Sequence, residues 1–261
     1  MNLDDLQSGP NVLYKYRTLS GEGSTWVRQT IVENEIYFSS PSRFNDPFDC
    51  KVFMSFGGSS RTWKKHFMAL LKKNRPDLNR QQRQAEAHRI ANDEKAHRNP
   101  EALGRMIADV QRRVDDIGIF SLCARNDDIL MWSYYAQNHE GLCLGFFRSG
   151  MFSGALPVEY SHTFPRVDYL KDTPERQMEA HCLTKAAAWQ HEKEWRLFDI
   201  ECGPGCRQYP PELLGEIILG SRMSQERRDD ILSWAQHHQP TPKLFEALLS
   251  DDAYGIKLRE L

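Results

Sequence analysis

The feature that most constrains the fold is the contrast between short apolar runs of strand length and one long polar stretch between them. The first runs are Val12–Arg17 and Ile36–Ser39, and strand and helix patterns alternate again from Ile117 onward. The stretch between them, residues 60–116, has the apolar spacing of helices. Strands of this length must pair in a sheet and bury at least one face. We therefore expect residues 1–261 to form a single α+β domain, with a mixed, mostly antiparallel sheet core and a basic helical insertion at 60–116.

The individual elements are expected from apolar periodicity and from cap and turn residues. A helix over Asp128–His139 is expected to be capped by Asn126 or Asp127 and to stop at Gly141. The other elements expected after Ile117 are strands at Ile119–Cys123, Leu142–Phe147, Pro157–Ser161 and Glu216–Leu219, helices over about Glu175–Ala188 and Ser224–His237, and a closing hairpin of Phe245–Leu249 with Tyr254–Leu258.

Charge and hydropathy limit the setting of the protein. The chain has 261 residues and a formal net charge of −2, which gives no overall attraction to nucleic acid or to an anionic membrane. No apolar run approaches the roughly 20 residues that span a bilayer. The N-terminus, Met1–Asp5, carries acid and lacks the apolar segment of a secretory signal. We expect a cytoplasmic protein with no membrane partner.

The sequence favours neither a disulfide framework nor a metal site. Its six cysteines are irregularly spaced, so we expect buried, reduced thiols. Cys202 and Cys206 lack the second pair of Cys or His residues that a zinc site needs. His191 and Glu192 begin like a metalloprotease helix, but Trp195 occupies the position of the second His. We expect no metal cofactor.

Basic residues accumulate in the helical insertion. Between Arg61 and Arg98 there are eleven Lys or Arg and four Asp or Glu, a local excess of 11 − 4 = +7. Such a run is usually the solvated face of a helix, and that interpretation stays open here. The alternative is that a basic lobe on a near-neutral protein holds a polyanion, which makes nucleic acid a candidate partner of residues 61–98.

The stretch Trp189–Phe198 carries the strongest indication of a site. As a strand with a period of two, it separates charged residues from packing residues, with Glu192, Glu194 and Arg196 on one face and Lys193, Trp195 and Leu197 on the other. Two carboxylates and a guanidinium are costly to bury unless they are paired or used. One interpretation is a structural row of ion pairs, and the other is the edge of a cleft that performs chemistry.

Two further motifs place polar groups along regular elements. On the first strand, Lys15 and Arg17 share one face. On the helix after Ile117, Trp132 and Tyr135 are three residues apart and are therefore neighbours. An aromatic pair at this spacing is more often core than ligand platform, and His139 at the helix end more often caps carbonyls than does chemistry.

A third motif is the turn-rich segment Phe38–Phe48. It contains Asn45 and Asp46, followed by Pro47. Asn and Asp most often bond local backbone amides in such a sequence, so we interpret both as structural.

Taken in order, these motifs resemble a bacterial family called domain of unknown function 2971. The matching motifs are Phe-Asn-Asp-Pro-Phe at 44–48, Met-Trp-Ser-Tyr-Tyr-Ala-x-x-His-x-Gly at 131–141 and Trp-x-x-Glu-x-Glu-Trp-Arg at 189–196. The resemblance covers nearly the whole chain outside the basic insertion, and it implies no reaction by itself.

More distantly, the order of polar residues resembles that of mono-ADP-ribosyltransferases. In that family a first-strand His or Arg, a middle strand with Ser or Tyr and a late strand with the catalytic Glu follow one another. The corresponding features here are Leu-Tyr-Lys-Tyr-Arg at 13–17, the serines Ser39, Ser40 or Ser121, and Glu192-x-Glu194. Lys15 stands where His is usual, and a charged Lys can only donate hydrogen bonds.

This second resemblance implies an ADP-ribosyltransferase-like fold and an enzyme that takes NAD as its substrate. Such an enzyme would be a mono-ADP-ribosyltransferase or NAD glycohydrolase of a bacterial defence or toxin type, modifying a nucleic acid or a protein. Its catalytic residues would be Glu194, whose charge stabilises an oxocarbenium-like transition state, and Glu192, which accepts a proton. The residues implied to bind NAD are Lys15, Tyr16, Arg17, Ser39, Trp132, Tyr135 and Arg196.

Two interpretations from other classes remain open. A metal-dependent nucleic-acid-processing enzyme would use Asp46, Glu192 and Glu194 as its carboxylates and the basic insertion as its dock. A non-catalytic sensing or interaction module would keep the Glu/Arg row as structural ion pairs.

Overall fold

The computed structural model describes residues 9–93 and 99–261, and these form two compact units. Unit 1 combines residues 9–45 with Asp116–Tyr160 and Lys185–Leu261, and unit 2 combines Asp46–Asp115 with Ser161–Thr184. The chain leaves unit 1 within β7 (Glu159–Ser161) and returns to it within β9 (Thr184–Ala186). The expectation of a single domain stays a prediction.

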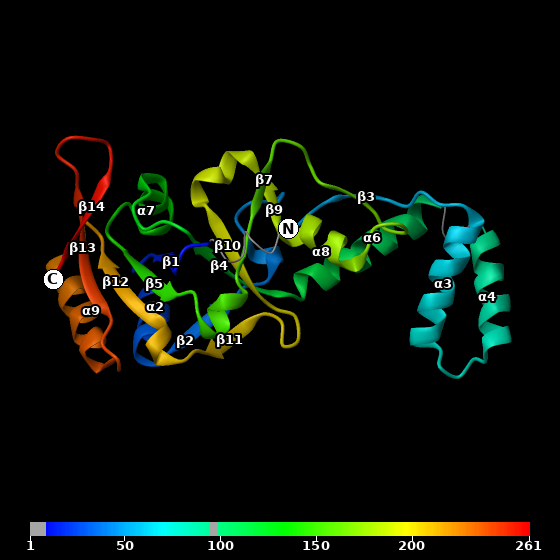
Figure 1. The fold of residues 1–261 in the computed structure, drawn as a ribbon, viewed down its shortest axis with the longest axis horizontal. Helices are drawn as coiled ribbons and strands as arrows, with labels where there is room; N and C mark the ends of the chain where they lie inside the picture. The colour runs from blue at the N-terminus through cyan, green and yellow to red at the C-terminus, as the bar shows by residue number, and fades with distance from the viewer. Residues whose placement is uncertain (1–8, 94–98) are drawn as a thin grey trace. The chain divides into compact units, whose positions relative to one another are not determined.

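Unit 1 is built on an eight-stranded sheet (Figure 1). In spatial order its strands are β14 (Ile256–Glu260), β13 (Lys243–Leu249), β12 (Leu214–Leu219), β5 (Leu142–Phe147), β1 (Val12–Arg17), β4 (Gly118–Cys123), β10 (Glu194–Asp199) and β6 (Leu156–Pro157). Neighbouring strands run antiparallel, except β12 and β13, which run parallel. The expected α+β class with a mostly antiparallel sheet is confirmed.

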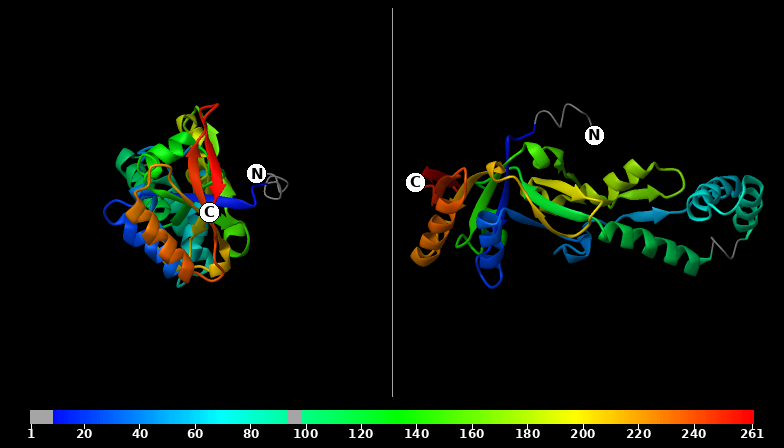
Figure 2. Two further views of the ribbon diagram at one scale, coloured as in Figure 1. Left: turned by 90° about the vertical axis from the view of Figure 1, so that its left-hand side faces the viewer. Right: turned by 90° about the horizontal axis from the view of Figure 1, so that it is seen from below.

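Side chains on the two faces of this sheet belong to two separate cores, because successive residues of a strand point to opposite sides. The core on one face includes Leu13, Phe120, Leu122, Leu144, Trp195 and Leu197. Helices α2 (Gly23–Val32) and α9 (Gln225–His237) lie side by side and add apolar residues to that core (Figure 2). Helix α7 (Ile129–Tyr135) packs in the core of the other face, which includes Tyr16, Cys123, Trp132 and Cys143.

Shorter elements complete unit 1. Strand β2 (Glu35–Phe38) pairs with β11 (Gly205–Gln208) in a separate two-stranded sheet. The 3-10 helices are η1 (Pro41–Arg43), η2 (Gly150–Gly154), η3 (Ala187–Glu192) and η4 (Pro211–Leu213).

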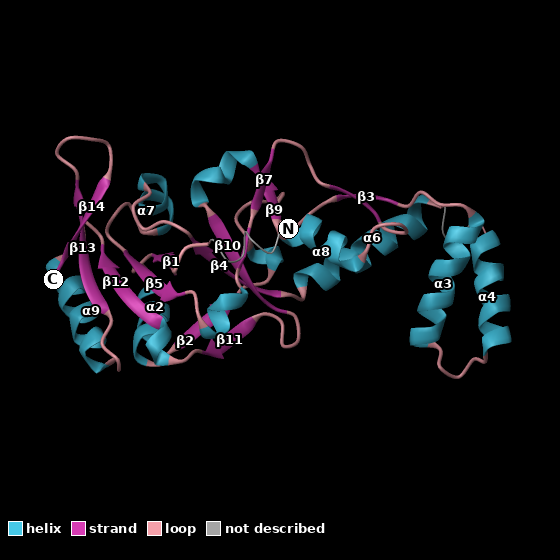
Figure 3. Cartoon of the chain, viewed as in Figure 1, coloured by secondary structure: helices cyan, strands magenta, loops and turns pink. Residues whose placement is uncertain are grey.

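Unit 2 is mainly helical (Figure 3). Its helices are α3 (Ser60–Asn74), α4 (Arg80–Asn92), α6 (Pro100–Asp115) and α8 (Pro174–Cys182), and β3 (Phe53–Ser55) pairs in parallel with β8 (Arg166–Asp168). Helices α3 and α4 pack against each other, and α3 carries five Lys or Arg and no Asp or Glu. Residues 94–98 of the expected basic segment lie outside the described residues, and its binding to nucleic acid stays a prediction.

The expected helix over Glu175–Ala188 is too long. Helix α8 ends at Cys182, and Thr184–Ala186 then forms β9. The alanines after Lys185 favour a helix, but propensity is a weak preference that tertiary contacts override. Here the buried contacts of Lys185 are made from an extended backbone.

Helix α7 is shorter than expected at both ends. Its N-cap is Asp128, whose carboxylate accepts the amides of Leu130 and Met131, rather than Asn126 or Asp127. The helix ends at Tyr135 because the backbone turns left-handed at residues 137, 138 and 139, with φ of 51°, 51° and 71°. His139 therefore lies beyond the helix instead of capping its last turn.

Two other expectations are partly wrong. The expected strand Pro157–Ser161 is split into β6 and β7. Four of the six cysteines are buried free thiols, as expected, but Cys202 and Cys206 are exposed.

None of the helices in the described part of the chain has the length and apolarity needed to cross a bilayer.

Candidate functional site

The centre of the site is an ion pair on β10. Glu194 and Arg196 are two residues apart and therefore share one face of the strand. Arg196 donates from Nε and Nη2 to the two carboxylate oxygens of Glu194, at 2.8 and 3.0 Å. Arg196 is fully buried, and its guanidinium lies 5.4 Å from the ring centroid of Phe44. The planar fork of arginine matches a carboxylate in this way, which offsets part of the cost of burying both charges.

Glu192 joins this pair through a bend in the backbone and not through strand periodicity. Helix η3 ends at Glu192, and Lys193 adopts the left-handed conformation, with φ of 42°. Strand β10 begins only at Glu194, so the expected strand is wrong for the first five residues of Trp189–Phe198. Its second half behaves as expected, since Trp195 packs in the core.

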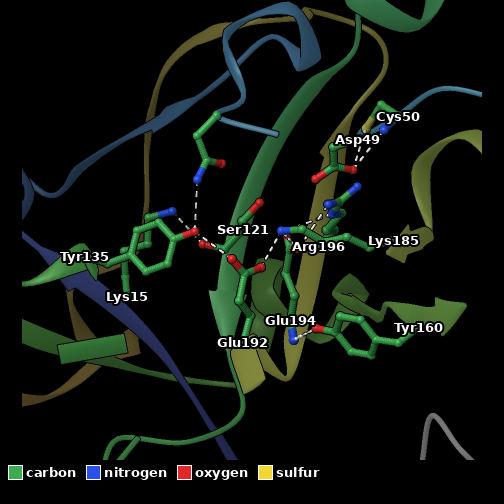
Figure 4. Close-up of polar contacts among 11 residues, drawn as sticks. Lys15, Asp49, Cys50, Ser121, Tyr135, Tyr160, Lys185, Glu192, Glu194 and Arg196 are labelled. Carbon is green, nitrogen blue, oxygen red and sulfur yellow. Dashed lines mark hydrogen bonds and ion pairs between the residues drawn. The ribbon is translucent and has the colours of Figure 1, made fainter. Parts of the chain in front are cut away.

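Lys185 links the two carboxylates. From β9 its ammonium donates to Glu192 and to Oε2 of Glu194, the latter at 2.9 Å. All three side chains are only 5–6% exposed. In Figure 4, dashed lines mark the contacts of Lys185 with Glu192 and of Lys185 and Arg196 with Glu194. Two buried carboxylates are thus combined with two buried cationic side chains. We call these four residues, Lys185, Glu192, Glu194 and Arg196, the carboxylate cluster.

Further polar groups surround the cluster. The hydroxyl of Tyr135, on α7, donates to Oε1 of Glu192 at 2.6 Å, and it accepts a hydrogen bond from the Asn45 amide at 3.3 Å. The Tyr160 hydroxyl accepts the backbone amide of Glu194 at 2.7 Å (Figure 4). The side chain of Ser121 bonds the Glu194 carboxylate. Each carboxylate is therefore held by a different set of neighbours.

These surroundings push the pKa values of the two carboxyls in opposite directions. Burial raises the pKa of Glu192 more than the charge of Lys185 lowers it. Burial also acts to raise the pKa of Glu194, but Arg196 and Lys185 outweigh it and hold that pKa well below its usual range. Glu194 therefore stays ionised, and Glu192 is the group of the pair that takes up a proton more readily.

A pocket of about 420 Å³ adjoins the cluster. Its lining is mostly aromatic and comprises Asn45, Tyr134, Tyr135, Ala188, Trp189 and His191. The His191 ring lies 6.3 Å from that of Tyr134 and 6.1 Å from that of Trp189, measured between centroids. Tyr135 belongs to the lining and also bonds Glu192, so a single hydroxyl connects the pocket to the carboxylates.

Lys15 is the first-strand residue that reaches the cluster. Its ammonium donates to the backbone carbonyl of Ser121 at 2.6 Å (Figure 4). Burial and the charge of Arg17 together lower the pKa of Lys15 to about 7, although Glu194 and Glu192 act to raise it. Lys15 therefore lies within electrostatic reach of both carboxylates.

Several other residues implied to bind NAD lie elsewhere. Tyr16 and Trp132 pack edge to face in the core, with ring centroids 5.2 Å apart, and Trp132 is fully buried. Ser39 forms a backbone bridge with Ile119, through hydrogen bonds of 2.9 Å in both directions. Arg17 lines a second cavity that shares no lining residue with the pocket beside Tyr135. The structure thus gathers Lys15, Tyr135, Glu192, Glu194 and Arg196 and does not add Tyr16, Arg17, Ser39 or Trp132 to them.

Asn45 and Asp46 differ in role. Oδ1 of Asp46 accepts the amide of Phe48 at 2.9 Å, which is the turn contact that the Asn-Asp-Pro sequence predicts. The side chain of Asn45, which we expected to be structural, instead lines the pocket and contacts Tyr135. Over residues 9–93 and 99–261, no three His, Cys, Asp or Glu side chains gather in a way that could hold a metal ion.

Sequence reasoning missed Lys185 and Trp189. A charge count could have pointed to Lys185, because two buried acids and one Arg196 guanidinium leave one negative charge without a base. The alanine-rich sequence around Lys185 predicted a helix and so concealed this role. For Trp189 and the rest of the aromatic lining, the sequence offered no comparable signal.

The comparison with protein families supports one of the two resemblances. Residues 131–197 match the model of a family described as a protein of unknown function, DUF2971. The match includes residues 131–135 of α7, with Trp132 and Tyr135, and all four residues of the carboxylate cluster. No curated protein and no solved structure matches the chain. The resemblance to mono-ADP-ribosyltransferases stays a prediction.

Proposed function

We propose that this chain is an NAD-consuming enzyme that breaks the bond between nicotinamide and ribose and transfers the ADP-ribosyl group to an acceptor. The observation that carries the proposal is the junction of the aromatic pocket with the carboxylate cluster. At that junction Tyr135 lines the pocket and donates to Glu192 at 2.6 Å. The aromatic pocket lies beside two carboxyl groups, one with a raised pKa and one with a lowered pKa. This combination suits the cleavage of an N-glycosidic bond.

The pocket suits a nicotinamide ring. Tyr134, Tyr135 and Trp189 offer aromatic surfaces on which the ring can stack. The side chain of Asn45 can exchange hydrogen bonds with the carboxamide group. A volume of about 420 Å³ is within the range of small-molecule sites, and it accommodates the nicotinamide end of NAD rather than the whole dinucleotide.

In the proposed reaction the bond between ribose C1′ and the nicotinamide nitrogen breaks, and nicotinamide leaves with the bonding electron pair. The ionised Glu194 stabilises the positive charge that develops on the ribose. The acceptor oxygen, from water or a hydroxyl group, then bonds C1′. Its proton passes to the Tyr135 oxygen while the Tyr135 proton passes to Glu192. In this scheme Glu192 is the general base and Glu194 the electrostatic partner.

Lys15 supports the same function. Its position on the first strand corresponds to the ribose-holding residue that the resemblance implies, and its charge interacts with both carboxylates. With a pKa of about 7, a substantial fraction of the Lys15 side chain is neutral at physiological pH. A neutral amine accepts hydrogen bonds as well as donating them, so this Lys can do what the usual His does.

We propose nucleic acid as the acceptor class. Helix α3 presents five basic and no acidic side chains, which favours contact with a phosphate backbone. The rate of ADP-ribose transfer to an oligonucleotide should fall as the salt concentration rises. The rate of NAD hydrolysis, which needs no oligonucleotide, should change much less.

The test is release of nicotinamide from NAD by the full-length protein, with and without an oligonucleotide. Glu192→Gln removes the base and should lower the rate by a factor of about 10²–10⁴. Glu159→Gln, at an exposed position on β7, is the matched control and should keep the wild-type rate. The proposal fails if the wild type does not release nicotinamide from NAD, or if Glu192→Gln turns over NAD at the control rate.

One observation favours a second candidate function, a non-catalytic sensing module. Each carboxylate of the cluster already has a buried cationic partner, as expected of structural ion pairs. A ligand in the aromatic pocket would then act through binding alone. An increase in melting temperature with NAD, without any release of nicotinamide, would select this candidate.

A further inference from the structure

The second cavity of unit 1 has a volume of about 460 Å³. It is lined by residues of α2, β2 and β11 and by Arg17 at the end of β1. Its size is within the usual range of small-molecule sites. Because it shares no lining residue with the pocket beside Tyr135, its occupant does not depend on the function proposed above.

Arg17 gives this cavity its chemical character. Among residues 9–93 and 99–261, its guanidinium has no hydrogen-bond or ion-pair partner. Arg196, by contrast, is bonded through two nitrogens to one carboxylate. Burial lowers the pKa of Arg17 to about 10, and no neighbouring acid offsets that effect. A half-buried guanidinium without a protein partner is available to pair with an anionic group of a ligand.

Two acids elsewhere in the lining of the cavity restrict what else the ligand can carry. Glu22 is exposed, and Glu35, which is half-buried, accepts a hydrogen bond from the Cys206 thiol. With Arg17, the three charged groups sum to 1 − 2 = −1. A phosphate ester adds about −1.5 to −2 and would raise the local charge to roughly −3. A zwitterion leaves the local charge at −1, and its ammonium group can pair with Glu35.

The rest of the cavity favours a flat apolar group. Trp26 and Tyr37 form an edge-to-face pair with ring centroids 5.1 Å apart, and both line the cavity. A third ring can add to such a pair by stacking or by edge contact.

We propose that this cavity binds a zwitterionic small molecule with a flat side chain, of the aromatic α-amino acid class. Its carboxylate pairs with Arg17, its ammonium group with Glu35, and its ring packs against Trp26 and Tyr37. The contrast between Arg17, which lacks a partner, and the carboxylates that line the same cavity carries the proposal.

The experiment is calorimetric titration of the full-length protein with four probes. L-Phenylalanine should bind saturably. Phenethylamine, which lacks the carboxylate, and 3-phenylpropionate, which lacks the ammonium group, should each bind at least tenfold more weakly. Adenosine monophosphate tests the phosphate-bearing alternative and should not bind in this cavity.

Three variants locate the binding. Arg17→Met should weaken L-phenylalanine binding at least tenfold without lowering the melting temperature, because it removes a charge that has no partner. Thr25→Trp, at an exposed position of α2 that lines the cavity, should obstruct binding even if Arg17→Met does not fold. Arg28→Met is the matched control on the same helix, where an exposed ion pair to Glu33 is lost and binding should persist.

The proposal is overturned by any of three results. These are absence of L-phenylalanine binding at millimolar concentration, tighter binding of adenosine monophosphate that depends on Arg17, and L-phenylalanine binding that survives both Arg17→Met and Thr25→Trp.

Discussion

Replacing Lys185 by Met should destabilise unit 1 far more at neutral pH than at mildly acidic pH. The substitution keeps most of the side-chain volume and removes the charge that links Glu192 to Glu194. Three charges of the carboxylate cluster then remain, with a net charge of −1. Breaking one buried ion pair by removing a partner typically costs about 3–5 kcal/mol.

The pH dependence sets the size of the effect. The variant can avoid a buried negative charge by protonating Glu192, whose pKa burial already raises. Protonating a carboxyl of ordinary pKa, about 4.3, costs about 3.7 kcal/mol at pH 7, at about 1.36 kcal/mol per pH unit. At pH 5 the same step costs about 1 kcal/mol. The loss in free energy of unfolding should therefore fall from about 4 to about 1 kcal/mol between pH 7 and pH 5.

Urea unfolding followed by tryptophan fluorescence measures this difference, because Trp195 lies in the core of unit 1. For a slope of about 2 kcal/mol per molar, the midpoint should shift by about 2 M at pH 7 and by much less at pH 5. Lys171→Met is the matched control, since it removes the same group from an exposed pair with Asp168 and should shift the midpoint little at either pH.

The double variant Lys185→Met, Glu192→Gln tests the cause. It leaves Glu194 paired with Arg196 and no unbalanced charge, so it should recover most of the stability at pH 7. A loss that is equal at pH 7 and pH 5, or one that Glu192→Gln does not relieve, would refute the electrostatic account and indicate a packing effect.

Two further predictions concern titration and capping. Because the pKa of Lys15 is lowered to about 7, the folded state binds fewer protons than the unfolded state above that pH. The free energy of unfolding of the wild type should therefore rise, relative to Lys15→Met, as the pH increases from about 7 to about 10, and urea midpoints at matched pH measure this. A constant difference across that range would contradict the burial of the ammonium group. Asp128→Ala removes the side chain that caps α7 and should lower the free energy of unfolding by about 0.5–2 kcal/mol, whereas Asp127→Ala, beside it, should change unfolding little. Equal effects of the two substitutions would argue against Asp128 as the cap.

The parts of the fold that the sequence predicted are those that local pattern determines. The apolar run that forms β5 and the alternation that forms the second half of Trp189–Phe198 can each be recognised within six residues. The pairing of Glu194 with Arg196 is of this kind, since a period of two places both on one face. The core position of Trp132 is also local, because an aromatic pair at helical spacing usually packs inward.

The parts that the sequence did not predict depend on backbone geometry or on distant contacts. The position of Glu192 depends on the left-handed conformation of Lys193, which a residue other than Gly seldom adopts. Arg17 was expected beside the carboxylates because it is on the same strand as Lys15, yet it lines another cavity. Where a long side chain ends is decided by the elements packed around the strand, and a single sequence does not contain that information.

The close spacing of the carboxylate cluster along the chain has a consequence for how the cluster assembles. Lys185 is seven residues from Glu192 and nine from Glu194. The entropic cost of closing a loop rises with its length, so bringing these groups together costs less than a contact between strands that are distant in sequence. The segment from Lys185 to Arg196 can therefore form its charge network as a local event and present it, already paired, to β4 and α7. We therefore expect the cluster to depend on the length of the Ala-Ala-Ala segment at 186–188, because one added residue would displace the ammonium group from both carboxylates at once.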